Sequence, residues 1–214
     1  TPSYKSKRQL RAGAIMNYLD LLRQRSSTRK FSSEQITERE LSAILLAANG
    51  APVGSNMYKD IHLAVVQNRE TLSELAQAAV WRSEDKRRIK EIVGDTELDT
   101  DDEITVKAHD PFYGAPTVIF VSHKNQDIQP GIEYANVACV VFSMHLAAVE
   151  LGLGSVFMWH ALESMREIPE LDNSHLLNLP EGFSPLLGLA LGYPAKEPRV
   201  RELRGDKIAA NYIN

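Results

Sequence analysis

The residues with the clearest potential for chemistry form one short basic segment, Arg25-Ser26-Ser27-Thr28-Arg29-Lys30-Phe31. An arginine guanidinium offers a fixed fork of N–H donors that matches phosphate oxygens, and serine and threonine hydroxyls add further donors. Backbone N–H groups at a turn can complete such an anion-binding concavity. The alternative is a solvated surface, because most short basic stretches bind no specific anion. The segment is therefore a candidate phosphate site.

Other catalytic patterns are missing from the sequence. The six histidines, His62, His109, His123, His145, His160 and His175, are scattered, with no pair on one helical turn. We therefore predict no metal site. No Gly-x-Ser-x-Gly elbow points to a hydrolase, and no Gly-x-Gly-x-x-Gly turn follows a strand to bind a dinucleotide. With these patterns missing, a bound cofactor is the remaining candidate for supplying the reactive chemistry.

The composition is that of an ordinary globular protein. The 214 residues are 24% charged and 43% hydrophobic, with a net charge of -4, so we expect no bulk attraction to nucleic acid or to a membrane surface. The single Cys139 lies among small apolar residues, which indicates a buried thiol in a reducing compartment. We predict one cytoplasmic domain over residues 1–214 without a membrane span. It has an N-terminal extension of about residues 1–14 and a C-terminal tail of about residues 202–214.

Hydrophobic spacing predicts the elements that position the basic segment. An amphipathic helix over Leu10–Leu22 leads directly into it, and the capping-box pattern from Thr37 to Glu40 starts a second helix. We expect further helices over residues 70–93 and 132–151, and strands over residues 61–66, 117–121, 156–159 and 184–193. This mixed order favours an α+β fold with helices packed on a sheet of about four or five strands. The acidic stretch Asp95–Glu103 is expected to be an exposed connection.

The long helix over Ile132–Leu151 is apolar nearly all round. A helix of this kind is buried on most sides. We therefore expect neighbouring elements or a partner subunit to cover it.

Five motifs in one order resemble the nitroreductase family of FMN-dependent oxidoreductases. They are the basic segment, Ala51-Pro52-Val53-Gly54-Ser55-Asn56, Gly114-Ala115-Pro116, Gly152-Leu153-Gly154-Ser155, and Leu179-Pro180-Glu181-Gly182 running to Leu189–Pro194. The resemblance extends from about Ile15 to Arg201. It implies a central, mostly antiparallel sheet flanked by helices and a domain-entwined homodimer with one FMN in each of two interface clefts. It also implies a ping-pong reaction, in which NADH or NADPH reduces the flavin and a nitroaromatic, a quinone or a related acceptor reoxidises it.

The resemblance also assigns cofactor contacts to the basic residues near both ends of the chain. The phosphate and ribityl chain would be held by Arg25, Ser26, Ser27, Arg199 and Arg201. Arg29 would lie near the pyrimidine edge of the ring. A guanidinium there would stabilise the negative charge of the reduced flavin, so Arg29 tunes the cofactor and no side chain is itself assigned as catalytic.

Two further groups are assigned to the flavin ring. The partner subunit would contribute Pro52, Val53, Ser55 and Asn56, with Asn56 bonding the ring edge. Met158, Trp159 and His160 would lie near flavin N5 and O4, with the backbone N–H groups of the last two making the contact.

Two departures from the family pattern keep alternatives open. Tyr58-Lys59-Asp60 stands where many members have Gln-Pro-Trp, and Trp159-His160 replaces smaller residues over the ring. These changes could narrow or redirect the acceptor pocket. One alternative is therefore an FMN-binding protein that acts on a different, specialised substrate or without nitroreductase turnover. Another is a structural dimer that has lost the cofactor.

Overall fold

The fold is built on a four-stranded antiparallel sheet. The computed structural model describes residues 17–77, 110–159, 162, 165–166 and 172–213. Within them the strands are β1 (Ile61–Val66), β2 (Thr117–Lys124), β3 (Gly154–Met158) and β4 (Phe183–Gly192), in the order β1-β2-β4-β3. All three strand pairs are antiparallel. The predicted α+β class with a mostly antiparallel sheet is confirmed.

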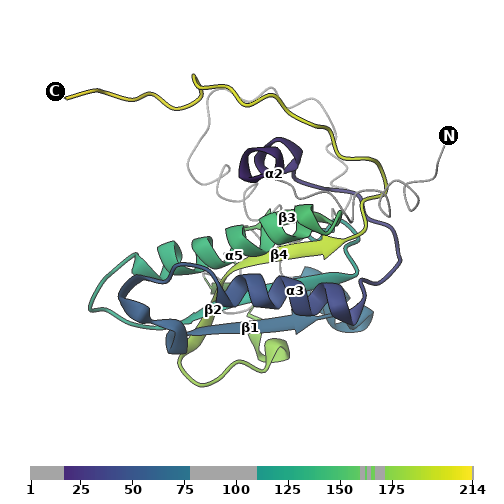
Figure 1. Cartoon of the computed structure of the whole chain (residues 1–214). Coiled ribbons are helices and arrows are strands. Elements are labelled where there is room, and N and C mark those ends of the chain that lie inside the picture. Colours follow the sequence, from purple (N-terminus) through teal and green to yellow (C-terminus); the bar gives the residue numbers. More distant parts are fainter. Residues whose placement is uncertain (1–16, 78–109, 160–161, 163–164, 167–171, 214) are drawn as a thin grey trace, which may run out of the picture.

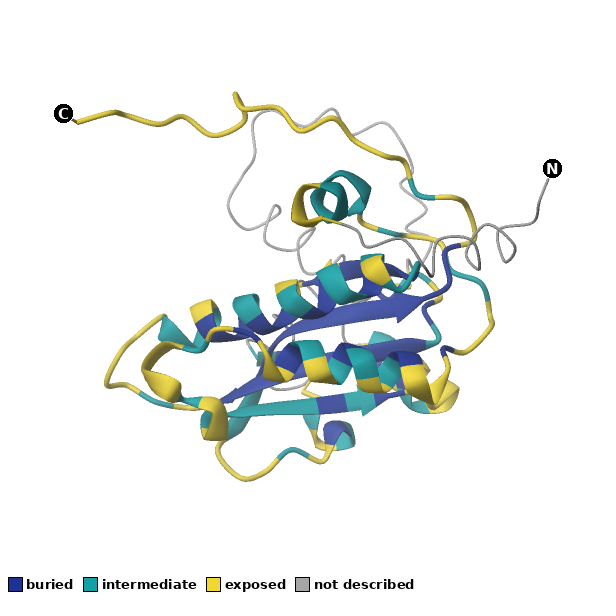
Figure 2. Cartoon of the chain, in the orientation of Figure 1, coloured by how far each residue is buried: buried dark blue, intermediate teal, exposed yellow. Residues whose placement is uncertain are grey.

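Helices cover both faces of this sheet. On one face, α3 (Glu38–Asn49) and α5 (Ile132–Glu150) lie side by side, as Figure 1 shows, and share one hydrophobic core with the strands. The opposite face is covered by the helical residues 69–77, the segment 110–116 and the short helix η4 (Ser174–Leu177). The strand β4, one of the two central strands, is buried over almost its whole length (Figure 2). The sheet is therefore a rigid platform between two layers.

Local sequence signals explain where the helices of the front layer begin and end. The capping box is formed as predicted, because the Thr37 hydroxyl accepts from the Glu40 N–H while the Glu40 carboxylate accepts from the Thr37 N–H. Gly152, with φ of 70°, follows the end of α5. A left-handed residue at this position is the usual helix stop, and glycine adopts it without strain. The chain then turns directly into β3.

The predicted first helix is wrong in its boundaries. Helix α2 spans Tyr18–Gln24, and Asn17 precedes it with extended backbone angles and a side chain that accepts from the Asp20 N–H. An asparagine cap of this kind sets the first residue of a helix, so no single helix runs over residues 10–22. Residues 10–16 lie outside the described part of the chain.

Other boundaries differ by a few residues or lie outside the described part. The helix expected over residues 70–93 is described over residues 69–77 only. Strand β3 starts at Gly154 rather than Val156, and β2 continues to Lys124. The N-terminal extension 1–14 and the acidic stretch 95–103 lie outside the described residues.

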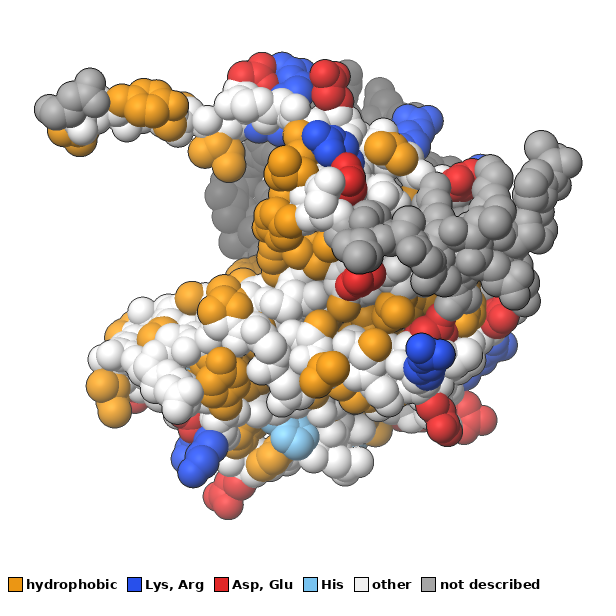
Figure 3. All heavy atoms as spheres, in the orientation of Figure 1, with side chains coloured by type: hydrophobic (Ala, Val, Ile, Leu, Met, Phe, Trp, Pro, Cys, Tyr) orange, Lys and Arg blue, Asp and Glu red, His pale blue; other side chains and the backbone are white. Residues whose placement is uncertain are grey.

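The C-terminal residues form a tail that leaves the body of the molecule. Residues 195–213 pass beside α2 without helix or strand, and residues 201–213 are all exposed. Figure 3 shows a hollow beneath the projecting tail, bordered by hydrophobic side chains on the flank of α2. Tyr18 and Leu19 of α2, Phe142 of α5, and Ile208 and Tyr212 of the tail are exposed large apolar side chains. One subunit therefore leaves a large apolar surface uncovered.

Helix α5 is long and apolar enough to cross a membrane by length and composition. It packs instead on the sheet and on α3, and seven of its residues are buried, five of them in the hydrophobic core. A core helix accounts for the same composition.

Candidate functional site

The basic segment lies against the sheet as a strap between α2 and α3. Ser27 forms a parallel bridge with Ser155 of β3, and the Thr28 N–H donates to the Ser155 carbonyl at 2.9 Å. Further along, the Ala195 N–H donates to the Lys30 carbonyl at 3.0 Å. A Cβ at Gly154 would lie 2.7 Å from Thr28 Oγ1 and Cγ2, so the glycine permits this close approach. The segment is an anchored structure within one chain.

Arg25 is held by a buried histidine of α5. Its Nη1 lies 3.1 Å from His145 Nε2, and the other ring nitrogen of His145 contacts Ser155 Oγ in a short hydrogen bond. His145 and Ser155 are buried, and Arg25 is half-buried. Burial lowers the pKa of His145 to about 4, because a charged imidazolium is disfavoured away from water. His145 is therefore neutral at pH 7.

The far end of the chain returns to the same place. The Arg201 N–H donates to the Arg23 carbonyl at 2.8 Å, and Arg201 Nη2 donates to the Arg25 carbonyl at 2.7 Å. The guanidinium of Arg201 thus adjoins the backbone of Arg25 from 176 residues away in sequence. Arg199 is exposed on the same stretch of tail. The structure therefore brings Arg25 and Arg201 together and leaves Arg199 close by in sequence.

The remaining residues of the segment face different surroundings. Ser27 is exposed, whereas Ser26 is half-buried and lines a narrow gap with Thr28, the end of α5 and Pro198. The exposed Arg29 places its guanidinium 5.9 Å from the centre of the Tyr113 ring, in a cation–π contact. Arg25, Ser27 and Arg29 are therefore the stronger candidates for ligand contact.

Strand β3 presents apolar side chains next to this segment. Phe157 and Trp159 are 42% and 41% exposed, whereas Met158 between them is only 4% exposed. Successive residues of a strand point to opposite sides, so Met158 points into the core and Phe157 to the other side. Trp159 follows directly after β3 and is exposed like Phe157. The predicted role of Met158 is thus limited to its backbone. His160 lies outside the described residues.

The predicted partner-facing residues form a tight turn at the other end of α5. Ser55 and Asn56 have φ of 54° and 58° and lie in the short helix η1 (Gly54–Asn56). Asn136 of α5 is buried and accepts from the Gly54 N–H at 2.8 Å. Pro52, Ser55 and Asn56 are exposed, and Val53 is half-buried. Two successive left-handed non-glycine residues are strained, which is a feature of functional loops.

The substituted stretch after this turn has a structural role. Residues Tyr58–Asp60 form the short helix η2, which leads directly into β1. The Tyr58 hydroxyl donates to the Ala51 carbonyl at 3.0 Å. The departure from the family pattern is accommodated here by closing the turn onto the end of α3.

The turn and the basic segment do not meet within one chain. Asn136 and His145, which hold them, are nine residues apart on α5, and nine residues of helix span roughly 14 Å. Their positions near the start and past the middle of α5 place the two loops apart. A ligand that contacts both within one chain has to be elongated.

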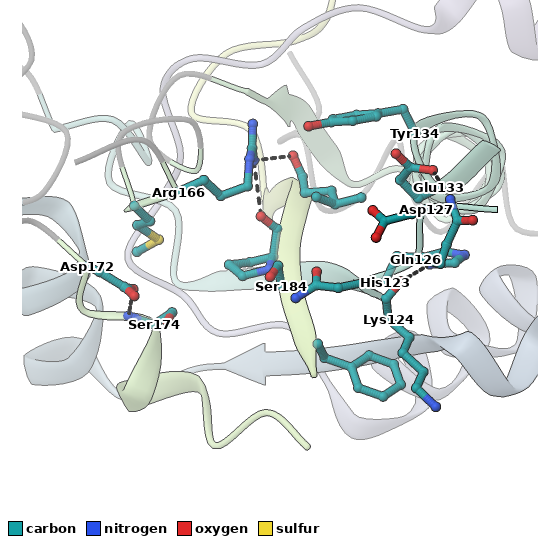
Figure 4. A pocket seen from close by; sticks show the side chains of 15 residues that line it. His123, Lys124, Gln126, Asp127, Glu133, Tyr134, Arg166, Asp172, Ser174 and Ser184 are labelled. Carbon is teal, nitrogen blue, oxygen red and sulfur yellow. Dashed lines mark hydrogen bonds between the residues drawn. The ribbon is translucent and has the colours of Figure 1, made fainter. Parts of the chain in front are cut away.

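A polar pocket of about 440 Å³ lies elsewhere, between the end of β2, the start of α5 and β4. Figure 4 shows Arg166 reaching across it, with Nη1 donating to the carbonyls of Pro185 and Leu186 at 3.1 Å. The same guanidinium lies 5.8 Å from the rings of both Tyr134 and Trp159. None of the predicted site residues lines the pocket. Arg166, which lines the pocket, connects it to Trp159.

Three residues of this arrangement were not predicted from the sequence. Asn136 and His145 act through contacts with loops far away along the chain, which no local pattern reveals. Phe157 could have been found, because strand alternation places it on the same side as Trp159.

Comparisons with known proteins give this geometry a context. The family model described as "Nitroreductase family" matches residues 22–193. A protein of Methanothermobacter thermautotrophicus, named as an NADH dehydrogenase/NAD(P)H nitroreductase, is 26% identical over 189 residues, which are 88% of this chain and 83% of that protein.

Solved structures agree with this match. A nitroreductase with bound FMN from Bacteroides fragilis superposes with a TM-score of 0.71 at 26% identity, over 92% of this chain and all of that one. An FMN-dependent nitroreductase from Clostridium difficile gives a TM-score of 0.64 at 26% identity, over 90% and 98% of the two chains. The FMN of these proteins agrees with the cofactor that the resemblance implied. Because the family model spans most of its length, the chain belongs to the nitroreductase family, which confirms the predicted fold and the predicted class of enzyme, a flavin-dependent oxidoreductase.

Proposed function

We propose that this chain binds FMN with its phosphate at Arg25 and Arg201 and works as an NAD(P)H-dependent oxidoreductase. The observation that carries the proposal is the hydrogen bond of 2.7 Å from Arg201 Nη2 to the Arg25 carbonyl. It joins two guanidinium-bearing residues from opposite ends of a chain whose net charge is -4. Two permanent cations that reach the same ligand would favour a dianionic phosphate. The exposed Ser27 adds a hydroxyl donor, and Arg199 adds a third cation on the same tail.

The flat part of the ligand suits the exposed face of β3. From Ser155, beside the phosphate residues, to Trp159 the strand direction covers about 13 Å, so a ligand that touches both places is elongated. Phe157 and Trp159 offer aromatic surface for a planar ring. The backbone N–H groups of Trp159 and His160 are the proposed donors to the ring edge, and Met158 contributes backbone only.

Arg29 is the proposed tuning residue. Its cation–π contact with Tyr113 holds the guanidinium on the exposed side of the segment. Placed near the pyrimidine edge, a fixed positive charge stabilises the negative charge that reduction puts on the ring.

The active form is proposed to be a homodimer. Ser55 and Asn56 are exposed, and we propose that the turn Pro52–Asn56 of one copy contacts the ring held by the other. Exposed apolar side chains on α2, α5 and the tail offer the surface for this second copy. Apolar area of this kind drives association when it is covered.

FMN, when bound, supplies the redox chemistry, taking a hydride from NADH or NADPH and passing electrons to an acceptor. The proposed acceptors are nitroaromatics, quinones or related flat molecules, because Phe157 and Trp159 favour aromatic stacking. The stack of Trp159 with Arg166 and Tyr134 fixes a bulky side chain beside the ring site. This observation favours a narrowed acceptor range, and so keeps as second candidate an FMN protein with a different, specialised substrate. One cytoplasmic domain stays our proposal for the whole chain.

An absorbance spectrum of the purified protein, recorded after FMN is added and unbound cofactor removed, tests the proposal. We expect a flavin spectrum that bleaches under anaerobic NADH or NADPH and returns when an acceptor is added. A protein that stays colourless would refute cofactor binding. Bound FMN that neither nicotinamide bleaches would refute the oxidoreductase and favour a binding module. Bleaching that no nitroaromatic or quinone reverses would select the second candidate.

A further inference from the structure

Among the described residues, the Arg25 side chain contacts an imidazole. Among the described residues the ion pairs are Arg23 with Asp20 and Arg204 with Asp206, and neither includes Arg25. The guanidinium instead contacts His145 Nε2 at 3.1 Å. His145 is 5% exposed and lies on α5, 120 residues away in sequence.

We propose that His145 is a positioning residue that fixes the direction of the Arg25 guanidinium and leaves its positive charge available to the phosphate of the cofactor. This inference rests on the proposed function, because it takes Arg25 as a phosphate ligand. No role for His145 follows from the motifs that carry the family resemblance.

The contacts of His145 determine its tautomer. A guanidinium has only donors, so Nε2 must accept and cannot carry a proton. The ring proton is then on Nδ1, and it donates to Ser155 Oγ. Ser155 also accepts the Thr28 N–H at its backbone carbonyl. A single buried residue of β3 therefore positions both the backbone of the basic segment and the imidazole that holds Arg25.

A neutral hydrogen-bond acceptor at this position both orients Arg25 and preserves its charge. Neither a carboxylate nor an aliphatic side chain would do both. A carboxylate would hold the guanidinium equally well but would offset its charge, which weakens the attraction for an anion. An aliphatic side chain would leave the charge intact but would leave the flexible arginine without a partner on this side. An imidazole both orients the fork and preserves the charge.

The protonation state of His145 agrees with this role. Burial lowers its pKa to about 4, so Nε2 is free to accept at neutral pH. The charged group that contacts the ring is Arg25, from the segment after α2, and the contact from β3 is the uncharged Ser155. A protonated imidazole would instead place a second positive charge against the Arg25 guanidinium.

Comparing FMN with riboflavin tests the proposal, because riboflavin has the same ring and ribityl chain without the phosphate. Binding of each ligand to apoprotein is measured by flavin fluorescence for wild type, His145→Leu and His145→Gln. We expect the leucine variant to bind FMN about tenfold more weakly, the effect of one hydrogen bond to a charged group, with riboflavin affinity unchanged. Glutamine, whose carbonyl oxygen can accept, should recover part of the loss.

Ser155→Ala provides a second test that does not alter the helix. Without Oγ as acceptor, the Nδ1 proton is no longer favoured, and FMN should bind about threefold more weakly with no change for riboflavin. Equal losses for the two ligands, or no loss for FMN, would overturn the inference. A glutamine variant as weak as the leucine variant would also overturn it.

Arg25→Gln separates this inference from the proposed function. If this variant keeps the wild-type preference for FMN over riboflavin, Arg25 is not a phosphate ligand and the proposed site is wrong. If it loses that preference while His145→Leu keeps it, only the role of His145 is wrong. In the Arg25→Gln background, His145→Leu should cause no further loss of preference.

Discussion

Two loops far apart on the molecule are held by the same helix in the same way. Asn136 and His145 are the two buried polar residues of α5, and each bonds to a loop that packs across the helix. Asn136 accepts from the Gly54 N–H, and His145 accepts from Arg25. Buried polar groups in an apolar helix need such partners, so each loop is placed by the requirement of one side chain.

The loops differ in how much of the chain supports them. The basic segment and the residues next to it also bond to β3 and to residues 193–201, through the N–H groups of Thr28, Ser32, Ala195 and Arg201. The turn at Ser55 and Asn56 is held by short-range bonds and by Asn136, with two left-handed residues exposed. The basic segment is thus anchored by several parts of one chain. The turn is exposed, as the proposed dimer requires.

The largest expected effect is on the pH dependence of stability, which should change with His145 and not with Asn136. Burial lowers the pKa of His145 from 6.5 to about 4, so between these values the unfolded chain binds a proton that the folded chain does not. Stability is therefore lost as pH falls through this window, by about 3 kcal/mol. Urea unfolding at pH 7 and pH 4 measures this loss. Between the two pH values, His145→Leu should lose about 3 kcal/mol less stability than wild type. Asn136→Leu, at a buried residue without a proton to gain, should keep the wild-type pH dependence. Identical pH dependence in both variants would contradict the buried neutral histidine.

Reversing the charge of Arg201, which bonds to the basic segment, tests whether this loop carries the affinity for phosphate. Arg201→Glu removes a charged donor and puts a negative charge beside Arg25, so FMN affinity should fall about a hundredfold. Lys207→Glu makes the same change of charge further along the exposed tail and should leave the affinity within about twofold. Fluorescence titration with FMN measures both. Equal losses would mean that only the overall charge matters.

A change that weakens the turn should lower stability without altering the preference for FMN over riboflavin. Asn136→Leu removes the acceptor of the Gly54 N–H, and we expect the free energy of unfolding to fall by about 1–2 kcal/mol. The ratio of FMN to riboflavin affinity should stay unchanged, because the turn serves the ring that both ligands share. A changed ratio would show that the two loops are not separate in function.

The smallest effect concerns strain in the turn. Ser55 has φ of 54°, which glycine adopts more easily. Part of the gain is lost to the greater freedom of glycine in the unfolded chain, so Ser55→Gly should raise the free energy of unfolding by about 0.5 kcal/mol. Ser33→Gly, at an exposed serine without positive φ, should lower it by a similar amount. Changes of the same sign would argue against strain at Ser55.

Local patterns predicted most of the elements but not all of their boundaries. The capping box at Thr37 and the apolar stripes of α3 and α5 act over a few residues, so they are visible in the sequence. The start of α2 was misplaced because the spacing from Leu10 onward is helical, whereas the Asn17 cap decides where the helix begins. Capping is a stronger local determinant than apolar spacing in a short helix.

The site was predictable in its residues and not in its geometry. Motif order indicated Arg25 and Arg201, and the structure joins them. The roles of His145 and Asn136 depend on contacts 120 and 82 residues away, which one sequence does not reveal. Met158 was assigned to the flavin ring with Trp159 and His160, but its side chain is buried in the core.

The central claim is that each FMN site combines the cations of one subunit with the turn of its partner. A mixed dimer tests it, with Arg201→Glu in one subunit and Asn56→Asp in the other. Aspartate tolerates the left-handed backbone at this position, but it loses the amide donor. The two parent dimers should both bind FMN weakly. In the mixed dimer one site receives both substitutions and the other receives neither, so we predict one FMN bound per dimer with wild-type affinity. A mixed dimer with no site of wild-type affinity would show that both groups come from the same subunit, and would contradict the account.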